Sequence, residues 1–312
     1  DKLAAVEVEC PDVPVHTHED GDSVGTNIDN VNEVIVSPGV PLTHPIVVLA
    51  RKKGISVVGD IELFARQTHS PIVGITGTNG KSTVTTLVGE MAKAAGLRVL
   101  VGGNIGEPVL DKGEGDFDWV VLELSSFQLE STYTLSPKIA CILNITPDHL
   151  DRYDSFEGYA AAKHRIYEKA ENAVMCSDDP LTMPPLTSPF YKGSHTTLTC
   201  FGLSEPSANH PWGITMENGE TYLTYGTERW LNVKEMKIKG THNWSNALAA
   251  LSIGHLMGLS KAVLCDVLRT FPGLEHRCQW VREVGHVDWY NDSKGTNVGS
   301  TLAAIKGLGG AM

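Results

Sequence analysis

Residues 71–83 constrain the fold of this chain more than any other stretch. They read Pro-Ile-Val-Gly-Ile-Thr-Gly-Thr-Asn-Gly-Lys-Ser-Thr: an apolar run leads into a loop that contains two glycines, and a helical pattern follows. This order of strand, loop and helix is typical of a phosphate-binding loop, because glycines let backbone N–H groups turn toward phosphate oxygens. Lys81 would reach the outer phosphates, and the hydroxyl of Ser82 or Thr83 would face Mg²⁺. The N-terminus of the helix that follows would favour the bound anion.

The spacing of this loop departs from the general phosphate-loop pattern. That pattern has its first glycine where Ile75 stands, whereas Gly77 lies much closer to Gly80. The alternative interpretation is an ordinary glycine-rich turn. We favour the phosphate loop because Gly-Lys-Ser-Thr stands between a good strand and a good helix.

Length and composition indicate a soluble, cytoplasmic protein of about two domains. The chain has 312 residues, of which 41% are hydrophobic and 20% charged, as in ordinary globular proteins. Its net charge of −12 disfavours nucleic acid as a partner. No apolar run approaches the roughly 20 residues of a membrane span, and no secretory signal opens the chain. Six scattered cysteines without a Cys-x-x-Cys pair suit reduced thiols. Because the chain begins Asp-Lys and ends Gly-Leu-Gly-Gly-Ala-Met, we expect both ends to be cut.

Strand and helix patterns alternate twice along the chain. The first alternation predicts a small α/β domain, and the second a larger, mostly parallel sheet, because its strands are continuous apolar runs. Ser37-Pro38-Gly39 follows the first strand, where α/β proteins often bind ligands. Residues 16–22 contain His and acidic side chains, which allow a metal site, but we expect a solvated loop. The predicted strands are 34–36, 55–58, 72–76, 97–101, 119–124, 139–144 and 173–176, and the predicted helices are 44–53, 61–66, 82–95 and 156–170.

The pattern changes between about residues 196 and 239. Short alternating segments around Gly and Asn turns predict a small antiparallel sheet with strands at 198–201, 221–225 and 233–238. The expected fold class is therefore α/β, with a phosphate-loop central domain that has a mostly parallel sheet and a small antiparallel sheet. Helices at 243–257 and 260–269, strands at 280–284 and 287–290, and a helix at 298–306 are predicted to follow.

Polar residues gather at the ends of the predicted strands. Glu123 closes one strand, and Asp148 and His149 follow another. Strand ends in such a sheet meet at the edge that carries the phosphate loop, so these residues are candidates for Mg²⁺ ligation or for positioning water. Mg²⁺ prefers oxygen ligands, which makes His uncommon. For each of them, and for Asp151, the alternative is a helix cap or a surface polar group.

Other polar residues also have a plain structural alternative. Asn104 could belong to a simple turn, Lys163 reads as a solvated helix lysine, and Asn243 could cap a helix. Arg277 follows a Pro-Gly turn, and Asn-Asp-Ser-Lys-Gly-Thr at 291–296 stands at another strand end. Together with the phosphate loop, these clusters indicate one nucleotide site.

Four stretches carry a family resemblance. They are Gly-Thr-Asn-Gly-Lys-Ser-Thr at 77–83, Glu-Leu-Ser-Ser-Phe-Gln-Leu-Glu at 123–130, Asp-His-Leu-Asp-Arg-Tyr at 148–153 and Asn-Asp-Ser-Lys-Gly-Thr-Asn at 291–297. Together they resemble the Mur ligases, the ATP-dependent amide-forming enzymes of peptidoglycan synthesis. The second and fourth resemble the members that add D-glutamate to UDP-N-acetylmuramoyl-L-alanine. The resemblance runs from about residue 33 to the end, and the shortened phosphate loop is then a feature of the family.

This resemblance implies roles for individual positions. Lys163 matches a carbamylated lysine of the family, whose carbamate can bind magnesium. Catalytic residues would be Lys81, His149 and Lys163, and metal ligands would be Ser82, Glu123, His149 and carbamylated Lys163. ATP would contact Gly77, Thr78, Asn79, Gly80, Lys81, Ser82, Thr83, Asn246, Arg277, Asp292 and Lys294. The muramoyl substrate and D-glutamate would contact Ser37, Pro38, Gly39, Asn104, Ser125, Gln128 and Thr296.

The implied reaction has two steps. The substrate carboxylate attacks the γ-phosphate of ATP, and the amine of D-glutamate then displaces phosphate from the acyl phosphate. Mg²⁺ and Lys81 would stabilise the charge on the transferring group. We expect residues 1–70 to be a remnant of the UDP-substrate domain, 71–275 the central ATP-binding domain, and 276–312 the start of a C-terminal ligase domain. The two outer domains would be partial and Rossmann-like.

Several expectations remain open at this point. Much of the family's outer domains is not recognisable here, so we expect the chain alone to bind nucleotide poorly and not to ligate, and to be a monomer. One alternative is another Mur or folylpolyglutamate-type ligase, against which Ser-Ser-Phe-Gln at 125–128 argues. The other is a nucleotide-binding module without catalysis.

Overall fold

The structure is a computed structural model that describes residues 8–13, 28–112, 115–185, 187–188 and 197–308. The chain forms two compact units, Asp1–Gly59 and Asp60–Met312. The stretch 16–22, whose sequence allows a metal site or a solvated loop, lies outside the described residues. The division into three domains at residues 70 and 275 stays a prediction.

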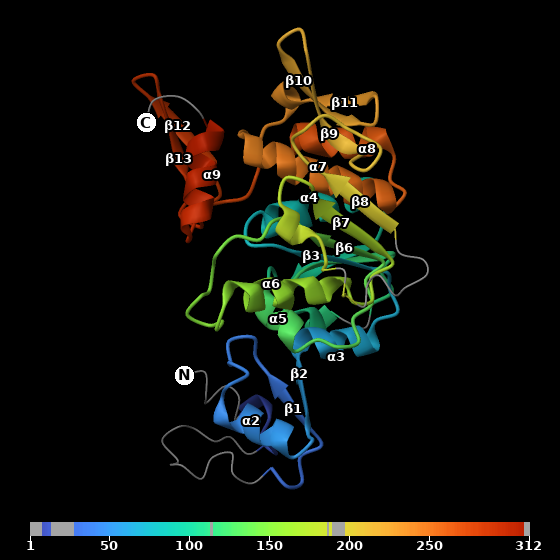
Figure 1. Ribbon diagram of the computed structural model, residues 1–312, viewed down its shortest axis with the longest axis vertical. Coiled ribbons are helices and arrows are strands. Elements are labelled where there is room, and N and C mark those ends of the chain that lie inside the picture. The colour runs from blue at the N-terminus through green and yellow to red at the C-terminus, as the bar shows by residue number, and fades with distance from the viewer. Residues whose placement is uncertain (1–7, 14–27, 113–114, 186, 189–196, 309–312) are drawn as a thin grey trace. The chain divides into compact units, whose positions relative to one another are not determined.

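The first unit contains a βαβ element (Figure 1). β1 (Glu33–Val36) pairs in parallel with β2 (Ser56–Gly59), and α2 (Pro45–Lys52) connects them. The three predicted elements of this region are confirmed. Ser37-Pro38-Gly39 directly follows β1, as expected for a strand-end turn. The buried core side chains are Ile28, Val36, Val47, Ala50 and Val57.

The second unit is built on a nine-stranded sheet. Across the sheet the strands are β11 (Glu228–Asn232), β10 (Glu220–Tyr225), β9 (Trp212–Glu217), β8 (Thr197–Phe201), β7 (Asn172–Cys176), β6 (Ile139–Ile142), β3 (Ile72–Thr76), β5 (Trp119–Glu123) and β4 (Val99–Gly103).

Six neighbouring strands, β8, β7, β6, β3, β5 and β4, run parallel. The predicted parallel sheet is confirmed, but the placement of 198–201 in the antiparallel sheet is wrong, because β8 pairs in parallel with β7. β8 meets β9 through one parallel pair, Phe201 and Trp212. β9, β10 and β11 then pair antiparallel. The antiparallel strands therefore extend the edge of the large sheet.

The predicted strand at 233–238 is wrong. Val233–Glu235 is a short 3₁₀ helix, η6. The Asn232 side chain accepts from the N–H of Lys234, and the Glu235 carboxylate accepts from the N–H of Asn232. This capping box ends β11 and turns the chain out of the sheet.

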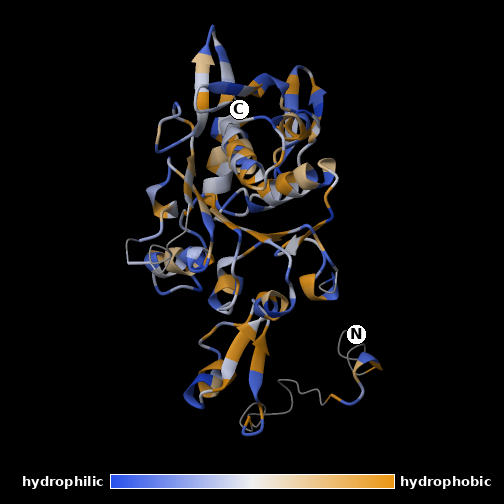
Figure 2. Cartoon of the chain, turned by 90° about the vertical axis from the view of Figure 1, so that its right-hand side faces the viewer, coloured by the Kyte–Doolittle hydropathy of each residue, from blue (hydrophilic) through white to orange (hydrophobic). Residues whose placement is uncertain are grey.

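Helices cover both faces of this sheet (Figures 1 and 2). α4 (Lys81–Ala94), α7 (Thr241–Leu256) and α8 (Lys261–Thr270) pack on one face. α3 (Asp60–Gln67), α5 (Ser126–Glu130) and α6 (Phe156–His164) pack on the other. Neighbouring strand residues point to opposite faces, so Val73 lies in one core and Ile72 in the other. Figure 2 shows the resulting apolar strands between the helix layers, as in parallel sheets buried on both sides. Short 3₁₀ segments are η2 (Val109–Lys112), η3 (Arg165–Tyr167) and η4 (Pro180–Thr182).

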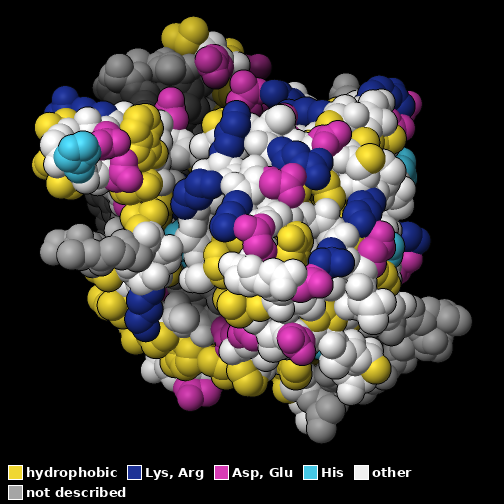
Figure 3. Space-filling model, turned by 90° about the horizontal axis from the view of Figure 1, so that it is seen from above, with side chains coloured by type: hydrophobic (Ala, Val, Ile, Leu, Met, Phe, Trp, Pro, Cys, Tyr) yellow, Lys and Arg dark blue, Asp and Glu magenta, His cyan; other side chains and the backbone are white. Residues whose placement is uncertain are grey.

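The last part of the chain is a hairpin followed by a helix, as predicted. β12 (Gln279–Val284) and β13 (Val287–Asn291) form their own antiparallel sheet, and α9 (Val298–Leu308) packs against α7. Figure 3 shows Lys and Arg interspersed with Asp and Glu on the upper face, so the described residues drawn there present no continuous basic surface. Of the helices that the structure describes, none is long and apolar enough to cross a bilayer.

Candidate functional site

The phosphate loop joins the end of β3 to the start of α4. Gly77 and Gly80 have φ values of 149° and 86°, which side-chain-bearing residues rarely adopt. A Cβ atom at Gly80 would lie 2.4 Å from Oδ1 of Asn246, so a glycine is needed there for space as well as for conformation. Gly80 is also the N-cap of α4, which leaves the first N–H groups of that helix free to bind an anion.

Two lysines bind the same carbonyl group of this loop. Nζ of Lys81 donates to the carbonyl oxygens of Gly77 at 2.9 Å and Thr78 at 2.8 Å. Nζ of Lys163, from α6, donates to the Gly77 oxygen at 3.0 Å. Lys163 is only 2% exposed, so the alternative of a solvated helix lysine is wrong.

Burial shifts the titration of both amines. It lowers the pKa of the Lys163 amine well below its usual value, and the nearby charge of Lys81 lowers this pKa further. Burial also lowers the pKa of Lys81, against the opposing effect of Glu123. A larger neutral fraction of the Lys163 amine follows, and a neutral amine is the form that reacts as a nucleophile.

Glu123 lies at the end of β5 and is 2% exposed. Its Oε1 accepts from Nδ2 of Asn104 at 2.9 Å. Its Oε2 is buried without a hydrogen-bond partner among the described residues. A buried carboxylate oxygen left unpaired is costly, and a cation at this position would compensate it. The site therefore fits a divalent metal.

The metal would not be held by a dense cluster of side chains. Across the described residues, no group of three or more His, Cys, Asp or Glu side chains stands close enough to hold an ion. Mg²⁺ typically uses one or two carboxylates, phosphate oxygens and water, which matches one orphaned carboxylate beside a phosphate loop. Oγ of Ser82 lies in the same cleft and accepts from Nη2 of Arg277 at 2.8 Å.

His149 follows β6 in a left-handed conformation with φ 52°. Its Nε2 is 3.8 Å from Oδ2 of Asp148. Its ring packs against Phe127, with centroids 5.0 Å apart. The imidazole lines the cleft but stays half exposed, so it is available to a ligand.

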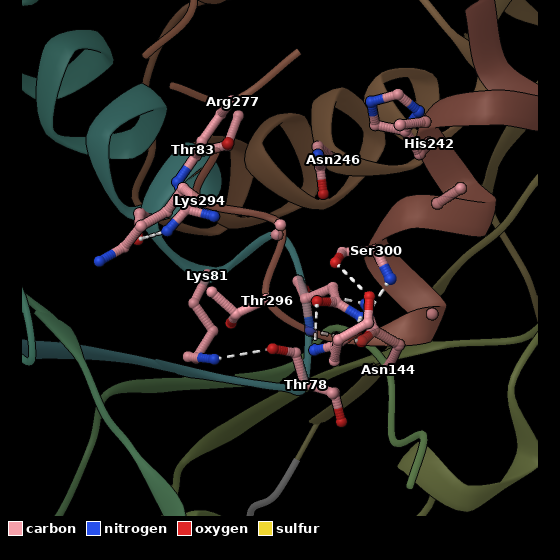
Figure 4. A pocket seen from close by; sticks show the side chains of 18 of the residues that line it. Thr78, Lys81, Thr83, Asn144, His242, Asn246, Arg277, Lys294, Thr296 and Ser300 are labelled. Atoms are coloured by element: carbon pink, nitrogen blue, oxygen red, sulfur yellow. Dashed lines mark hydrogen bonds between the residues drawn. The ribbon is translucent and has the colours of Figure 1, made fainter. Parts of the chain in front are cut away.

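A cleft of about 600 Å³ brings these elements together. Figure 4 shows Lys81 and Thr78 on one side, Arg277 and Lys294 on another, and Asn246 from α7. Fourteen of the residues predicted for the site line it: Thr78, Asn79, Gly80, Lys81, Ser82, Thr83, Asn104, Glu123, His149, Asn246, Arg277, Asp292, Lys294 and Thr296.

Other predicted site residues are not part of the cleft wall. Gly77 and Lys163 act from beneath the loop through the shared carbonyl. Ser125 and Gln128 form the capping box of α5: the Gln128 N–H donates to Oγ of Ser125, and the Ser125 N–H donates to Oε1 of Gln128. Ser37-Pro38-Gly39 belongs to the other unit of the chain.

Two residues that contact the phosphate loop are not among the predicted site residues. Asn144, at the end of β6, accepts from the N–H of Asn79 at 2.8 Å and donates to its carbonyl at 3.0 Å. The Tyr159 hydroxyl lies 3.0 Å from Oγ1 of Thr78, and Nζ of Lys163 lies 4.6 Å from its ring centre. Strand-end position could have pointed to Asn144, whereas Tyr159 reads as an ordinary helix aromatic.

Residues 75–254 match the family described as the Mur ligase middle domain. The chain is 52% identical over 314 aligned residues to the UDP-N-acetylmuramoylalanine–D-glutamate ligase of Legionella pneumophila (strain Paris), and the match covers 99% of this chain and 68% of that protein. It is 51% identical to the protein of the same name from a Pseudomonas fluorescens strain, over 89% of this chain and 60% of that protein.

Solved structures show the same fold at lower identity. The pseudomurein peptide ligase type C from Methanothermus fervidus has a TM-score of 0.61 at 20% identity, covering 90% of this chain and 64% of that one. MurF from Acinetobacter baumannii has a TM-score of 0.60 at 18% identity, covering 77% of this chain and 54% of that one. The predicted α/β fold class is confirmed by this likeness.

Proposed function

We propose, from the premise that this chain belongs to the Mur ligase family, that its cleft is the nucleotide site of an ATP-dependent ligase. The reaction is the addition of D-glutamate to UDP-N-acetylmuramoyl-L-alanine through an acyl phosphate, as the names of the relatives suggest. The first step passes the γ-phosphoryl group of ATP to the substrate carboxylate. The second is attack of the D-glutamate amine on the acyl carbon, with release of phosphate.

The phosphate loop carries the nucleotide half of this proposal. Its free N–H groups at the start of α4 would bind the phosphates, and Lys81 would leave the loop carbonyls to neutralise the transferring group. The adenosine side would be bound by four further residues that line the same cleft. Those residues are Asn246, Arg277, Asp292 and Lys294.

Magnesium would be held by Glu123, Ser82 and His149, with the carbamate of Lys163 as a further ligand. The metal supplies charge neutralisation at the phosphates. A carbamate forms when the neutral Lys163 amine adds CO₂ and releases one proton. Burial and the neighbouring Lys81 favour that neutral amine, which supports the modification.

Substrate contacts complete the proposal. Asn104 would contact the muramoyl substrate, Thr296 would lie near D-glutamate, and Ser37-Pro38-Gly39 would bind the uridine diphosphate. Ser125 and Gln128 would also contact the substrate, which requires that they share the hydrogen bonds of their capping box. We further propose a cytoplasmic monomer.

One observation carries the proposal above the others. The unpaired Oε2 of Glu123 and the ammonium of Lys81 lie in one cleft at the end of a phosphate loop. This pair provides an anion site and a cation site side by side, as phosphoryl transfer with Mg²⁺ requires.

A chimera tests the function directly. This chain would replace the aligned part of the Legionella relative, and phosphate release would be measured with ATP, UDP-N-acetylmuramoyl-L-alanine and D-glutamate, L-glutamate or L-lysine. We expect release that depends on D-glutamate and is lost in Lys81→Ala. A folded chimera that prefers L-lysine or L-glutamate would point to another ligase. One that binds ATP without turnover would leave only a nucleotide-binding module.

A further inference from the structure

Asn297 joins the beginning of α9 to the phosphate loop by a reciprocal pair of side-chain amides. Its Nδ2 donates to Oδ1 of Asn79 at 3.2 Å, and Nδ2 of Asn79 donates back to Oδ1 of Asn297 at 3.4 Å. Nδ2 of Asn297 also donates to Oδ2 of Asp148 at 3.1 Å. One side chain near the end of the chain therefore contacts two loops that begin at different strand ends.

The Asn79 side chain can make this contact because its backbone is already held. Asn144 accepts from the N–H of Asn79 and donates to its carbonyl oxygen. The main chain at Asn79 is thus fixed by the end of β6, and its side chain is fixed by α9. None of these hydrogen bonds involves the N–H groups of the loop residues after Asn79.

Asn297 also has an ordinary structural role. Its Oδ1 accepts from the N–H of Ser300 at 2.8 Å, which is a helix cap for α9. Capping uses only the oxygen, whereas the bonds to the two loops also use the Nδ2 donor. The two roles can therefore be separated by substitution.

The residues directly before Asn297 line the nucleotide cleft. Asp292, Lys294 and Thr296 line it together with Asn297, and all three stand within five residues of Asn297 along the chain. The other end of the segment is held by the N–H of Cys278, which donates to Oδ1 of Asp292, so Asn297 limits how far the segment can move from the phosphate loop.

We infer that Asn297 is a positioning residue for the nucleotide: through Asn79 and Asp148 it holds segment 292–296 against the phosphate loop. This inference rests on the proposed function and adds a coupling between two halves of the site. Asn297 would affect binding of the nucleoside, which segment 292–296 contacts. It would not affect binding of the phosphates, which the phosphate loop contacts.

The test compares MgATP with magnesium tripolyphosphate, which has no nucleoside. Asn297→Asp keeps the oxygen that caps α9 but removes the amide donor and places a second carboxylate beside Asp148. Asn297→Ser also caps, without the charge. We expect both variants to bind MgATP about tenfold more weakly, as for the loss of one or two net hydrogen bonds. Their affinity for tripolyphosphate should stay within about twofold of the unmodified protein, because the phosphate loop loses no hydrogen bond to the phosphates.

Two further variants separate positioning from stability. Ser260→Ala removes the cap of α8, and it should lower the melting temperature without changing either affinity. In a double-mutant cycle, Asn79→Ala combined with Asn297→Ser should weaken MgATP binding less than the sum of the single changes. Isothermal titration calorimetry with millimolar ligand would measure these affinities, because we expect the chain to bind nucleotide weakly.

Each result decides between the claims. Unchanged MgATP affinity in Asn297→Ser would overturn the inference while the proposed function stands. An equal loss of affinity for MgATP and for tripolyphosphate would also overturn the inference, because the substitution would then have altered the phosphate loop itself. If neither the unmodified protein nor the chimera binds MgATP or tripolyphosphate, the proposed function fails, and this inference fails with it.

Discussion

Lys81 and Lys163 donate to one acceptor, the carbonyl oxygen of Gly77, at 2.9 and 3.0 Å. Two ammonium groups on one oxygen repel each other, and burial removes the water that would screen them. The arrangement stabilises the neutral form of Lys163, whose side chain is the less exposed of the two. The two lysines are therefore coupled through this carbonyl.

Carbamylation of Lys163 can be observed without catalysis. In ¹³C-labelled bicarbonate, we expect a carbamate resonance that is absent in Lys163→Ala. The exposed Lys93, which pairs with Glu90 on the surface, provides Lys93→Ala as a control that should retain the signal. In the chimera, acetate should partly restore activity to Lys163→Ala but not to Lys81→Ala. A spectrum identical for the unmodified protein and Lys163→Ala would contradict the assignment.

Glu123→Gln removes the unpaired carboxylate oxygen and keeps an acceptor for Asn104. We expect Mn²⁺, used as a probe for Mg²⁺, to bind at least about tenfold more weakly in the presence of ATP, because the direct carboxylate ligand is lost. Electron paramagnetic resonance of free Mn²⁺ measures this change. The surface variant Glu90→Gln should bind Mn²⁺ normally, and an unchanged affinity in Glu123→Gln would remove Glu123 from the metal site.

Gly80→Ala and Gly96→Ala form a matched pair. Both glycines have a positive φ, 86° and 81°, but a Cβ at Gly80 would meet Asn246 while one at Gly96 would meet nothing within 4 Å. Each alanine should destabilise the fold by about 1–2 kcal/mol from backbone strain. Only Gly80→Ala should also weaken MgATP binding, because Asn246 must move. Equal MgATP affinities in the two variants would show that Asn246 does not contact the nucleotide.

Glu62 makes stability depend on pH. Burial would raise the pKa of its carboxyl, but the N–H groups of Thr134 and Tyr133 and the side chain of Arg66 outweigh burial and lower the pKa below 4.5. The stabilisation is therefore complete above about pH 4.5 and is lost as the pH falls through the lower, folded-state pKa.

The variant Glu62→Gln should reveal this contribution. At pH 7 it should unfold with about 1–3 kcal/mol less free energy than the unmodified protein, as when hydrogen bonds to a buried charge are lost. Urea unfolding should show the difference shrinking as the pH falls below about 4.5. A difference that is constant from pH 7 to pH 3 would contradict the role of the charge.

The sequence predicts the parallel part of the fold from β3 to β7. Continuous apolar strands such as Trp119–Glu123 are recognisable because both faces are buried, and the glycine loop marks where strand becomes helix. β9 and β11 are not among the predicted strands, because short strands that mix polar and apolar residues have little periodic pattern. The predicted strand at 233–238 begins with a 3₁₀ helix, and 198–201, predicted in the antiparallel sheet, pairs in parallel with β7. The turn at Asn232 depends on a capping box that competes with the strand pattern after it.

The site was predictable only where the residue type itself is informative. Lys81 indicates a phosphate loop because it follows a glycine between a strand and a helix, and Glu123 is recognisable as an acid at the end of a strand. Lys163 does not, because burial of a helix lysine depends on how α6 packs beneath the loop. The contacts of Asn144 and Asn297 join distant parts of the chain, which no local pattern encodes.

The antiparallel strands at the edge of the large sheet also have a consequence for solubility. Without them, β8 would end the sheet as an open parallel edge that another chain could pair with. The outer strand is instead β11, which carries charged Glu228 and Arg229, and the Arg229 carbonyl accepts from Nζ of Lys261 on α8. At this end of the sheet, the charged side chains of β11 and the lysine bound to its carbonyl disfavour the addition of another strand.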